Sequence, residues 1–167
     1  EELIQNKEII KKLNGKSNII FKRKSTFNKI IDNTSSEIQF AFGRINYSST
    51  FHLKEGKIIC KGIAPIVEQY PRLTFNCLVN AEDKNKFLRQ FSIKNKLDKS
   101  NLSISTAGSL NLLNRKINFK EIKLGENYFA NEEDIEFFKE VFERTLFDEN
   151  FFKIFASDKI KNFIKEL

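Results

Sequence analysis

The stretch Asn101–Leu124 constrains the fold more than any other part of the sequence. Apolar and polar residues alternate along it, and the polar tripeptide Asn114-Arg115-Lys116 interrupts the alternation. Alternation with a period of two residues between turn signals is typical of strands with one buried face. The stretch therefore predicts a long strand, a tight turn and a return strand. The apolar residues that we assign to one face of this hairpin are Leu102, Ile104, Leu110, Leu112, Ile117 and Phe119.

Earlier parts of the chain repeat the strand pattern. In residues 37–47 the apolar positions Ile38, Phe40 and Phe42 shift phase at Gly43, which we interpret as one strand with a β-bulge. The polar cluster 32–36 before it predicts a loop. The expected strands cover residues 17–24, 37–47, 49–54, 57–64 and 72–81, and Phe75 lies on the apolar side of the last one.

The expected sheet is bent. Gly108 interrupts the first strand of the hairpin, and beyond Phe119 the apolar phase slips to Ile122 and Leu124, both of which are bulge signals. Short amphipathic helices are predicted near residues 1–14 and 83–93, and Asn131 caps a third helix with Ile135, Phe138, Phe142 and Leu146 along one side. The fold class is therefore α+β: a mostly antiparallel, bent sheet over residues 1–130, and a C-terminal helical cap of the same domain over residues 131–167.

The charge of +7 raises the possibility of an anionic partner. Only six of the 29 basic residues are Arg, the side chain that reads phosphate and guanine through two hydrogen bonds. A surface of dispersed Lys is more often solvated than specific, so nucleic acid is the less favoured partner. No run approaches the ~20 apolar residues of a membrane-spanning helix. Because the chain begins with Glu1, we expect it to be a fragment or a mature piece of a longer protein.

Candidate residues for catalysis or metal binding are sparse. His52 is the only histidine, and it lacks the partners that a zinc site or a catalytic triad needs. The acidic clusters at Glu82-Asp83 and Glu132-Glu133-Asp134 suit the first turns of helices, where carboxylates interact favourably with the dipole. The glycines occur singly, so no phosphate-binding loop is recognisable. We expect no enzyme activity, no cofactor and no metal.

Two cysteines, Cys60 and Cys77, flank the proline-containing link 65–71 almost symmetrically. If the strands on either side pair as a hairpin, the two residues lie nearly opposite each other. A disulfide is then possible in an oxidising compartment, and two buried thiols are the alternative.

The hairpin also resembles a known family. The segment Ser105–Phe119, with a small-residue strand, a "GSLNL" core and a polar turn into an "INF" strand, resembles the C-terminal region of AsmA-like bacterial envelope proteins. The preceding strand 72–81 and helix 83–91 fit the same order, and the resemblance covers roughly residues 37–125. AsmA-like proteins resemble bridge-like lipid transfer proteins, in which an inner-membrane anchor precedes a long β-groove that carries phospholipid across the periplasm.

The resemblance implies a non-enzymatic segment that binds or conducts phospholipid between the inner and outer membranes. It places the chain on the periplasmic side of the cell envelope, anchored through upstream sequence, with membrane proteins as partners at the chain ends. The residues that would line the groove are Phe40, Phe42, Phe75, Leu102, Ile104, Leu110, Leu112, Ile117 and Phe119. Two alternatives remain: a basic nucleic-acid-binding domain, and a peripheral module whose Phe- and Lys-rich tail lies on anionic membrane.

Overall fold

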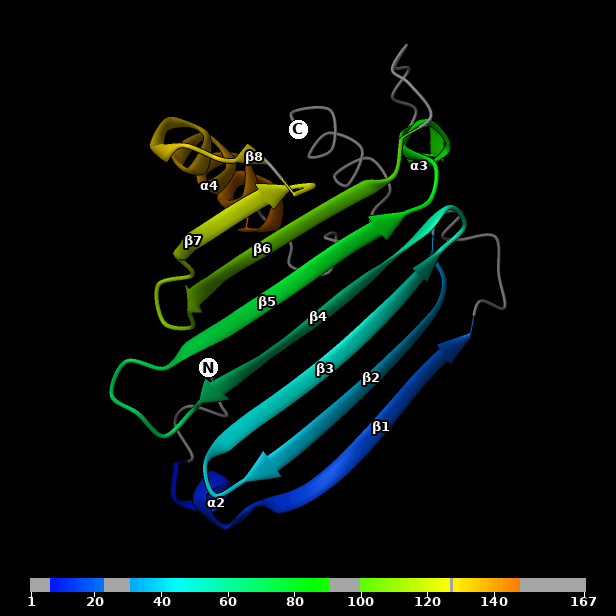
Figure 1. The fold of residues 1–167 in the computed structure, drawn as a ribbon. Helices are drawn as coiled ribbons and strands as arrows, with labels where there is room; N and C mark the ends of the chain where they lie inside the picture. Colours follow the sequence, from blue (N-terminus) through cyan, green and yellow to red (C-terminus); the bar gives the residue numbers. More distant parts are fainter. Residues whose placement is uncertain (1–6, 23–30, 91–99, 127, 148–167) are drawn as a thin grey trace.

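The sheet meanders in sequence order. The computed structural model describes residues 7–22, 31–90, 100–126 and 128–147, and within these ranges eight strands form one antiparallel sheet in the order β1 to β8 (Figure 1). The strands are β1 (Asn14–Lys22), β2 (Ile31–Ala41), β3 (Arg44–Leu53), β4 (Gly56–Pro65), β5 (Arg72–Ala81), β6 (Leu102–Asn111), β7 (Ile117–Leu124) and β8 (Tyr128–Phe129). The helices are α2 (Lys7–Lys12), α3 (Lys84–Gln90) and α4 (Glu132–Phe147). The α+β class and the mostly antiparallel, bent sheet are confirmed.

The predicted hairpin of residues 101–124 is present as β6 and β7. Leu110 lies opposite Ile117, and the turn between them includes Arg115 in the left-handed region, at φ 59°. The Asn111 carboxamide oxygen accepts hydrogen bonds from the backbone N–H groups of Leu113 and Asn114, which closes the turn locally. The expected bulge is also confirmed, since the register shifts between Ala107 and Gly108.

Residues 37–47 do not form one bulged strand, and that interpretation is wrong. The chain reverses at Phe42-Gly43, where both residues have positive φ, 47° and 86°. Two-residue hairpin turns favour such a pair because its twist matches the twist of the flanking strands. Phe40 therefore lies opposite Ile45, and the phase shift in the sequence marks a reversal.

The polar cluster 32–36 belongs to β2 and is not a loop. Thr34, Ser35 and Ser36 pair with β1 on one side and with β3 on the other. Ladder hydrogen bonds on both sides satisfy the backbone, so sheet context overrides the weak strand preference of this segment. The second and third segments expected in the C-terminal cap, beyond residue 147, lie outside the described residues.

The pairing register separates the sheet into two unlike faces. Directly opposed residues of an antiparallel sheet point to the same side, and neighbours along a strand point to opposite sides. One side, the apolar face, carries rows such as Thr34, Phe51, Ile58, Val79, Ile104 and Leu124. The other side, the polar face, carries rows such as Asn33, His52, Lys57, Asn80 and Ser103.

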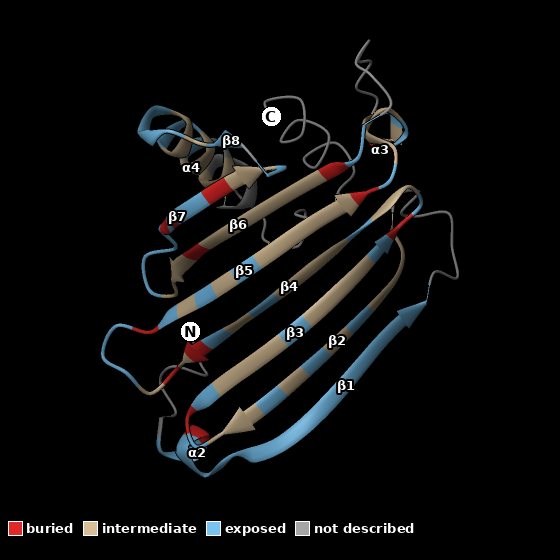
Figure 2. Ribbon diagram, in the orientation of Figure 1, coloured by how far each residue is buried: buried red, intermediate tan, exposed pale blue. Residues whose placement is uncertain are grey.

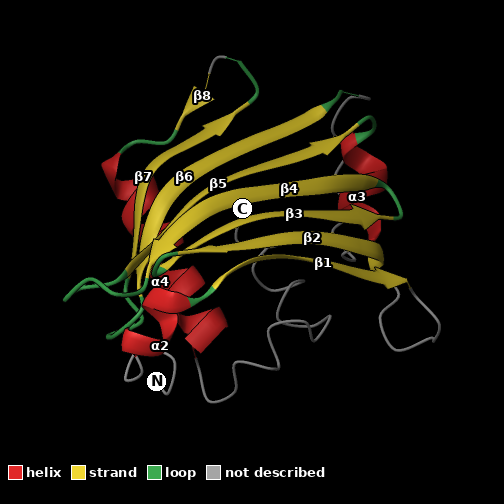
Figure 3. Cartoon of the chain, turned by 90° about the horizontal axis from the view of Figure 1, so that it is seen from below, coloured by secondary structure: helices red, strands yellow, loops and turns green. Residues whose placement is uncertain are grey.

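All three described helices pack on the apolar face, and Figure 3 shows the strands bending around that side. Phe87 of α3 packs against Leu53, Ala81 and Leu102. Ile10 of α2 joins Ala64 and Ile66 at the opposite ends of the strands. A third cluster, under α4, combines the buried residues Ile117, Phe119 and Ile122 with Ile135, Phe138 and Phe142. In Figure 2 the buried positions of the strands lie mostly near strand ends and on β7.

Candidate functional site

The described helices leave one part of the apolar face without a partner. The three core clusters take in residues at both ends of the strands and along β7, but they do not include the middle of β1, β2 and β3. Ile38, Phe40, Tyr47 and Phe51 are half-buried there, while Ile19 and Phe21 on β1 are exposed. We call these six residues the open apolar patch. Large apolar side chains gathered on one sheet face in this way often mark a binding site for a partner or a lipid.

An aromatic row runs from Tyr47 of the patch across the sheet towards α4. Across the strands, Tyr47, Gly62, Phe75, Gly108 and Phe119 follow one another on the apolar face. A Cβ atom on Gly62 would lie 2.9 Å from the Tyr47 ring, and one on Gly108 would lie 2.6 Å from the Phe75 ring. The rings of Tyr47 and Phe75 therefore lie over the glycines of the next strand. Phe75 continues into an edge-to-face contact with Phe119, with ring centroids 5.7 Å apart.

Tyr47 contributes a hydroxyl group to this otherwise apolar surface. Burial raises the pKa of the Tyr47 hydroxyl, because the charged phenolate loses hydration at this position. The group therefore stays neutral at physiological pH and offers a hydrogen bond without a charge. Such a group suits the polar end of an otherwise apolar ligand.

A short belt of small polar side chains crosses the centre of the apolar face beside the aromatic row. Ser36 and Ser49 share a hydrogen bond of 2.9 Å between their hydroxyl oxygens. Next to them, Cys60 and Cys77 are directly opposed and joined by a disulfide, the pairing for which the sequence left two alternatives. The disulfide ties β4 to β5 at the middle of the sheet.

The structure places the nine residues that the resemblance assigns to the groove lining in different environments. Seven of them lie on the apolar face: Phe40, Phe75, Leu102, Ile104, Leu110, Ile117 and Phe119. Leu102, Ile117 and Phe119 are buried, and Phe75 and Ile104 pack against them, beneath α3 and α4. These five residues belong to the core clusters, Leu110 is half-buried opposite Ile117, and Phe40 is the member of the set that lies in the open apolar patch.

The other two expected residues do not line a sheet face. Phe42 occupies the turn between β2 and β3, and its side chain is 72% exposed. Leu112 follows the last residue of β6 and packs against the cluster around Ile10. The sequence missed Ile38, Tyr47 and Phe51 as members of the patch, because the reversal at Gly43 that places them together was interpreted as a bulge.

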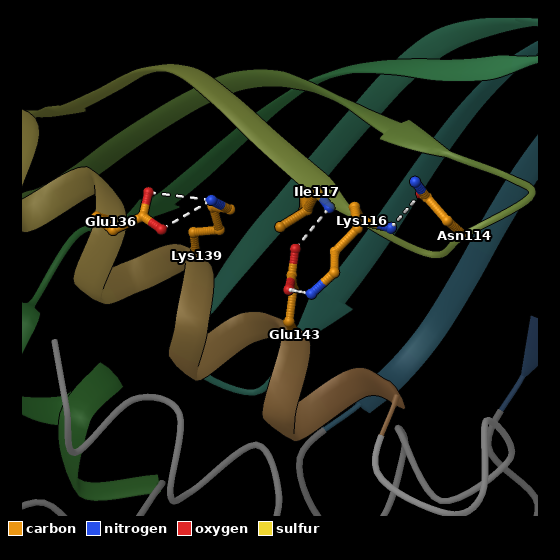
Figure 4. Close-up of polar contacts among 6 residues, drawn as sticks. All are labelled: Asn114, Lys116, Ile117, Glu136, Lys139 and Glu143. Atoms are coloured by element: carbon orange, nitrogen blue, oxygen red, sulfur yellow. Dashed lines mark hydrogen bonds and ion pairs between the residues drawn. The ribbon is translucent and has the colours of Figure 1, made fainter. Parts of the chain in front are cut away.

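An ion pair between Glu143, on α4, and Lys116, just before β7, fixes α4 to the sheet (Figure 4). Glu143 accepts hydrogen bonds from the Ile117 backbone N–H, at 2.9 Å, and from the Lys116 ammonium group, at 2.8 Å. Burial by itself raises the pKa of Glu143, but these bonds and the charges of Lys116 and Lys139 outweigh it, so that the pKa lies below its usual range. The carboxylate therefore links α4 to the start of β7, where α4 packs on the apolar face.

The polar face is basic. Among the residues of β1 to β7 that are paired in the sheet, the charged ones on this face are seven cations and two anions: Lys16, Lys22, Arg44, Lys57, Lys61, Arg72 and Lys123, against Glu37 and Glu121. Lys16 and Glu37 form an ion pair of 2.9 Å. His52 lies on the same face among neutral polar residues and Lys57.

The residues that the structure describes contain no cluster of three or more His, Cys, Asp or Glu side chains suited to a metal ion. None of the helices described is long and apolar enough to cross a membrane. A hollow beside α3 is lined by three cations and three anions, so its formal charges balance: Lys54, Lys57 and Lys86 against Glu55, Glu82 and Asp83.

Comparisons with known proteins give no relative: no family model, no curated protein and no solved structure matches the chain.

Proposed function

We propose that this chain binds phospholipid or fatty acyl chains on the open apolar patch, as a non-enzymatic segment of an AsmA-like envelope protein. The observation that carries the proposal is a bent sheet whose apolar face is covered at both ends and along β7 by the described helices, but is uncovered by them over β1 to β3. An acyl chain fits such a surface because it is long, apolar and narrow, and it needs no specific hydrogen bonds.

Two further observations support an acyl chain over a protein segment. The Tyr47 ring lies over Gly62, so the patch includes an aromatic surface on which a flexible chain can lie without matching individual side chains. Tyr47 and the Ser36–Ser49 pair offer neutral hydrogen-bonding groups at the edge of that surface, suited to an ester or a carboxyl group. The resemblance of residues 37–125 to AsmA-like proteins adds the expectation of an envelope location.

The test measures lipid bound to the purified chain. Extraction with organic solvent and mass spectrometry should find phospholipid or fatty acid with the wild type and much less with Ile38→Asp. The matched control is Gln39→Asp, which places the same charge on the next residue of β2 but on the opposite face, where Gln39 is exposed. Far-UV circular dichroism establishes that both variants fold.

Two outcomes contradict the proposal. The first is a folded wild type that carries no lipid and takes up no fluorescent fatty acid from solution. The second is equal retention of lipid by Ile38→Asp and Gln39→Asp, which would locate the lipid away from the patch. Phe119→Asp is unsuited to this test, because Phe119 is buried under α4 and its loss would unfold the chain.

The basic polar face favours a second candidate function, binding to the surface of an anionic membrane. The paired residues of this face, seven cations against two anions, carry a net charge of +5, which favours an anionic surface. Each Lys or Arg near an anionic surface contributes about 1 kcal/mol at low ionic strength. The polar-face residues of the described strands include Phe129 as an aromatic side chain, too little for a platform of stacked nucleic-acid bases.

Co-sedimentation with vesicles tests this candidate. Binding to phosphatidylglycerol vesicles should decrease with salt and should fall on replacing Lys57 and Lys61 by Gln, whereas phosphatidylcholine vesicles should not bind. Equal or tighter binding to single-stranded DNA under the same conditions would favour the nucleic-acid alternative instead.

A further inference from the structure

The two edges of the sheet are unequal, and β1 is the exposed one. Within the part of the chain that the structure describes, β8 closes one edge with two residues, while β1 presents nine residues at the other edge. Every residue of β1 is exposed, as the pale blue strand in Figure 2 shows. An edge strand presents backbone N–H and C=O groups that another strand can pair with, and natural proteins rarely leave a long edge uncovered.

Three large apolar side chains lie in succession on this edge. Ile19, Ile20 and Phe21 are 52%, 66% and 59% exposed. Ile19 and Phe21 point to the apolar face, and Ile20 points to the polar face. A single lipid-binding face does not account for Ile20, whereas a paired strand shelters apolar residues on both faces. We propose that β1 pairs with β1 of a second copy of this chain, forming one continuous antiparallel sheet through a two-fold axis.

Symmetry restricts the register of such a pair. Opposed residues must lie on the same face, and a two-fold axis perpendicular to the sheet then places one residue opposite its own counterpart. With Ile20 on the axis, Ile19 of each copy lies opposite Phe21 of the other copy. Lys22 then lies opposite Asn18, and no two cations oppose each other within the described strand.

Registers centred nearer the start of β1 are less favourable. A centre at Ile19 places Lys22 opposite Lys16, and like charges directly opposed destabilise a sheet. A centre at Asn18 places Ile20 opposite Lys16 and Phe21 opposite Gly15, so no large apolar residue gains an apolar partner. The register centred on Ile20 pairs all three apolar residues with one another and extends the apolar face across both copies.

The experiment measures the mass of the purified full chain by sedimentation equilibrium over a range of concentrations. The wild type should be dimeric, and Ile20→Lys should weaken the dimer about tenfold or more, because two ammonium groups then meet at the axis. The matched control is Phe137→Lys on α4, which also replaces an exposed apolar side chain, 47% exposed, and should leave the dimer intact.

A cysteine variant tests the register itself. The sequence holds two cysteines, both in the disulfide, so the thiol of Ile20→Cys is the sole free one. Opposed Cβ atoms in a sheet lie about 4.5–5.5 Å apart, so mild oxidation should link the two copies of Ile20→Cys. Ile63→Cys, at an exposed position of β4, should stay unlinked.

A wild type that is monomeric at every concentration overturns the proposal, as does a dimer that tolerates Ile20→Lys. A dimer in which Ile20→Cys fails to link overturns the register. None of these results depends on bound lipid, which the Ile38→Asp comparison measures separately.

Discussion

At the scale of single residues, the contacts of two glycines set how closely the strands and their rings approach. Gly62 and Gly108 both lie beside a backbone carbonyl of the adjoining strand, and a Cβ atom at either position would come within 2.4 Å or less of a carbonyl oxygen. Neither glycine has a positive φ that would require its flexibility. Their role is steric: they leave room for the Tyr47 and Phe75 rings and for the neighbouring strand.

Gly108→Ala should therefore destabilise the chain by roughly 1–3 kcal/mol, the usual cost of overpacking. The added methyl group would meet the Asn118 carbonyl oxygen and the Phe75 ring. Urea denaturation followed by circular dichroism measures the change. Gly15→Ala is the control, since a Cβ atom there meets nothing within 4 Å, and an equal loss in both variants would contradict the steric role.

Glu143→Gln should destabilise the chain at neutral pH but not at acidic pH. The pKa of Glu143 is lower in the folded chain than in the unfolded chain, so its carboxylate stabilises the fold above the unfolded-state pKa of about 4.3. That stability is lost as the pH falls through the lower, folded-state pKa. We expect a loss on the order of 1 kcal/mol at neutral pH, by thermal denaturation across the pH range.

Glu136→Gln provides the comparison for this pH profile. Glu136 also pairs with a lysine, Lys139, but the Glu136 side chain is exposed, and exposed pairs contribute only a few tenths of a kcal/mol. A pH-independent difference between wild type and Glu143→Gln would show that its carboxylate charge does not stabilise the fold.

At the scale of secondary structure elements, the central disulfide and the helices packed on the apolar face hold the strands of the sheet together. The pairing of Cys60 with Cys77 closes a separation of 17 residues that contains both prolines. The disulfide lies near one end of the pairing between β4 and β5, because the paired residues of β4 run only from Lys57 to Lys61. Beyond it, the Thr74 hydroxyl bonds to the backbone of Ile63.

Reduction of the disulfide should lower the free energy of unfolding by about 3 kcal/mol, the value expected from loop entropy for a loop of this length. Thermal denaturation with and without reductant measures the loss. The double variant Cys60→Ser, Cys77→Ser should be equally destabilised and insensitive to reductant. Alkylation of two free thiols in the chain purified without reductant, detected by intact mass, would contradict the disulfide.

At the scale of the whole molecule, one sheet connects the three described helices, which belong to separate core clusters. Each strand pairs with its neighbours in sequence order, and α2, α3 and α4 cover separate regions of the apolar face. A meander of this kind contains mainly contacts between consecutive strands. We expect it to unfold as one unit, because three small clusters around one sheet are each too small to be stable alone.

Phe87→Ala tests this expectation. It removes the buried anchor of α3 and should cost roughly 3–5 kcal/mol. Because the sequence has no Trp, tyrosine fluorescence reports on the regions of Tyr47, Tyr70 and Tyr128, all outside α3. Circular dichroism and tyrosine fluorescence should give the same lowered urea midpoint. Separate midpoints would show that the α3 end unfolds independently.

The sequence by itself determined the class of fold and most of its elements. Alternation in β5, β6 and β7, the bulge near Gly108 and the capped start of α4 are local properties of the chain, set by side-chain periodicity and backbone preference. These features need no knowledge of distant contacts. The opposition of Cys60 and Cys77 followed from their spacing only on the condition that the strands flanking the proline link pair, and the disulfide was one of two alternatives.

Only the tertiary structure decided which apolar residues are core and which are open. Alternation marks one face of a strand but says nothing of what packs on it, so Phe119 under α4 and Phe40 in the open apolar patch look alike in sequence. The reversal at Gly43 and the strand formed by residues 32–36 likewise depend on pairing with neighbours on both sides. Burial and strand pairing are properties of the assembled sheet, because each is fixed by partners distant in the chain.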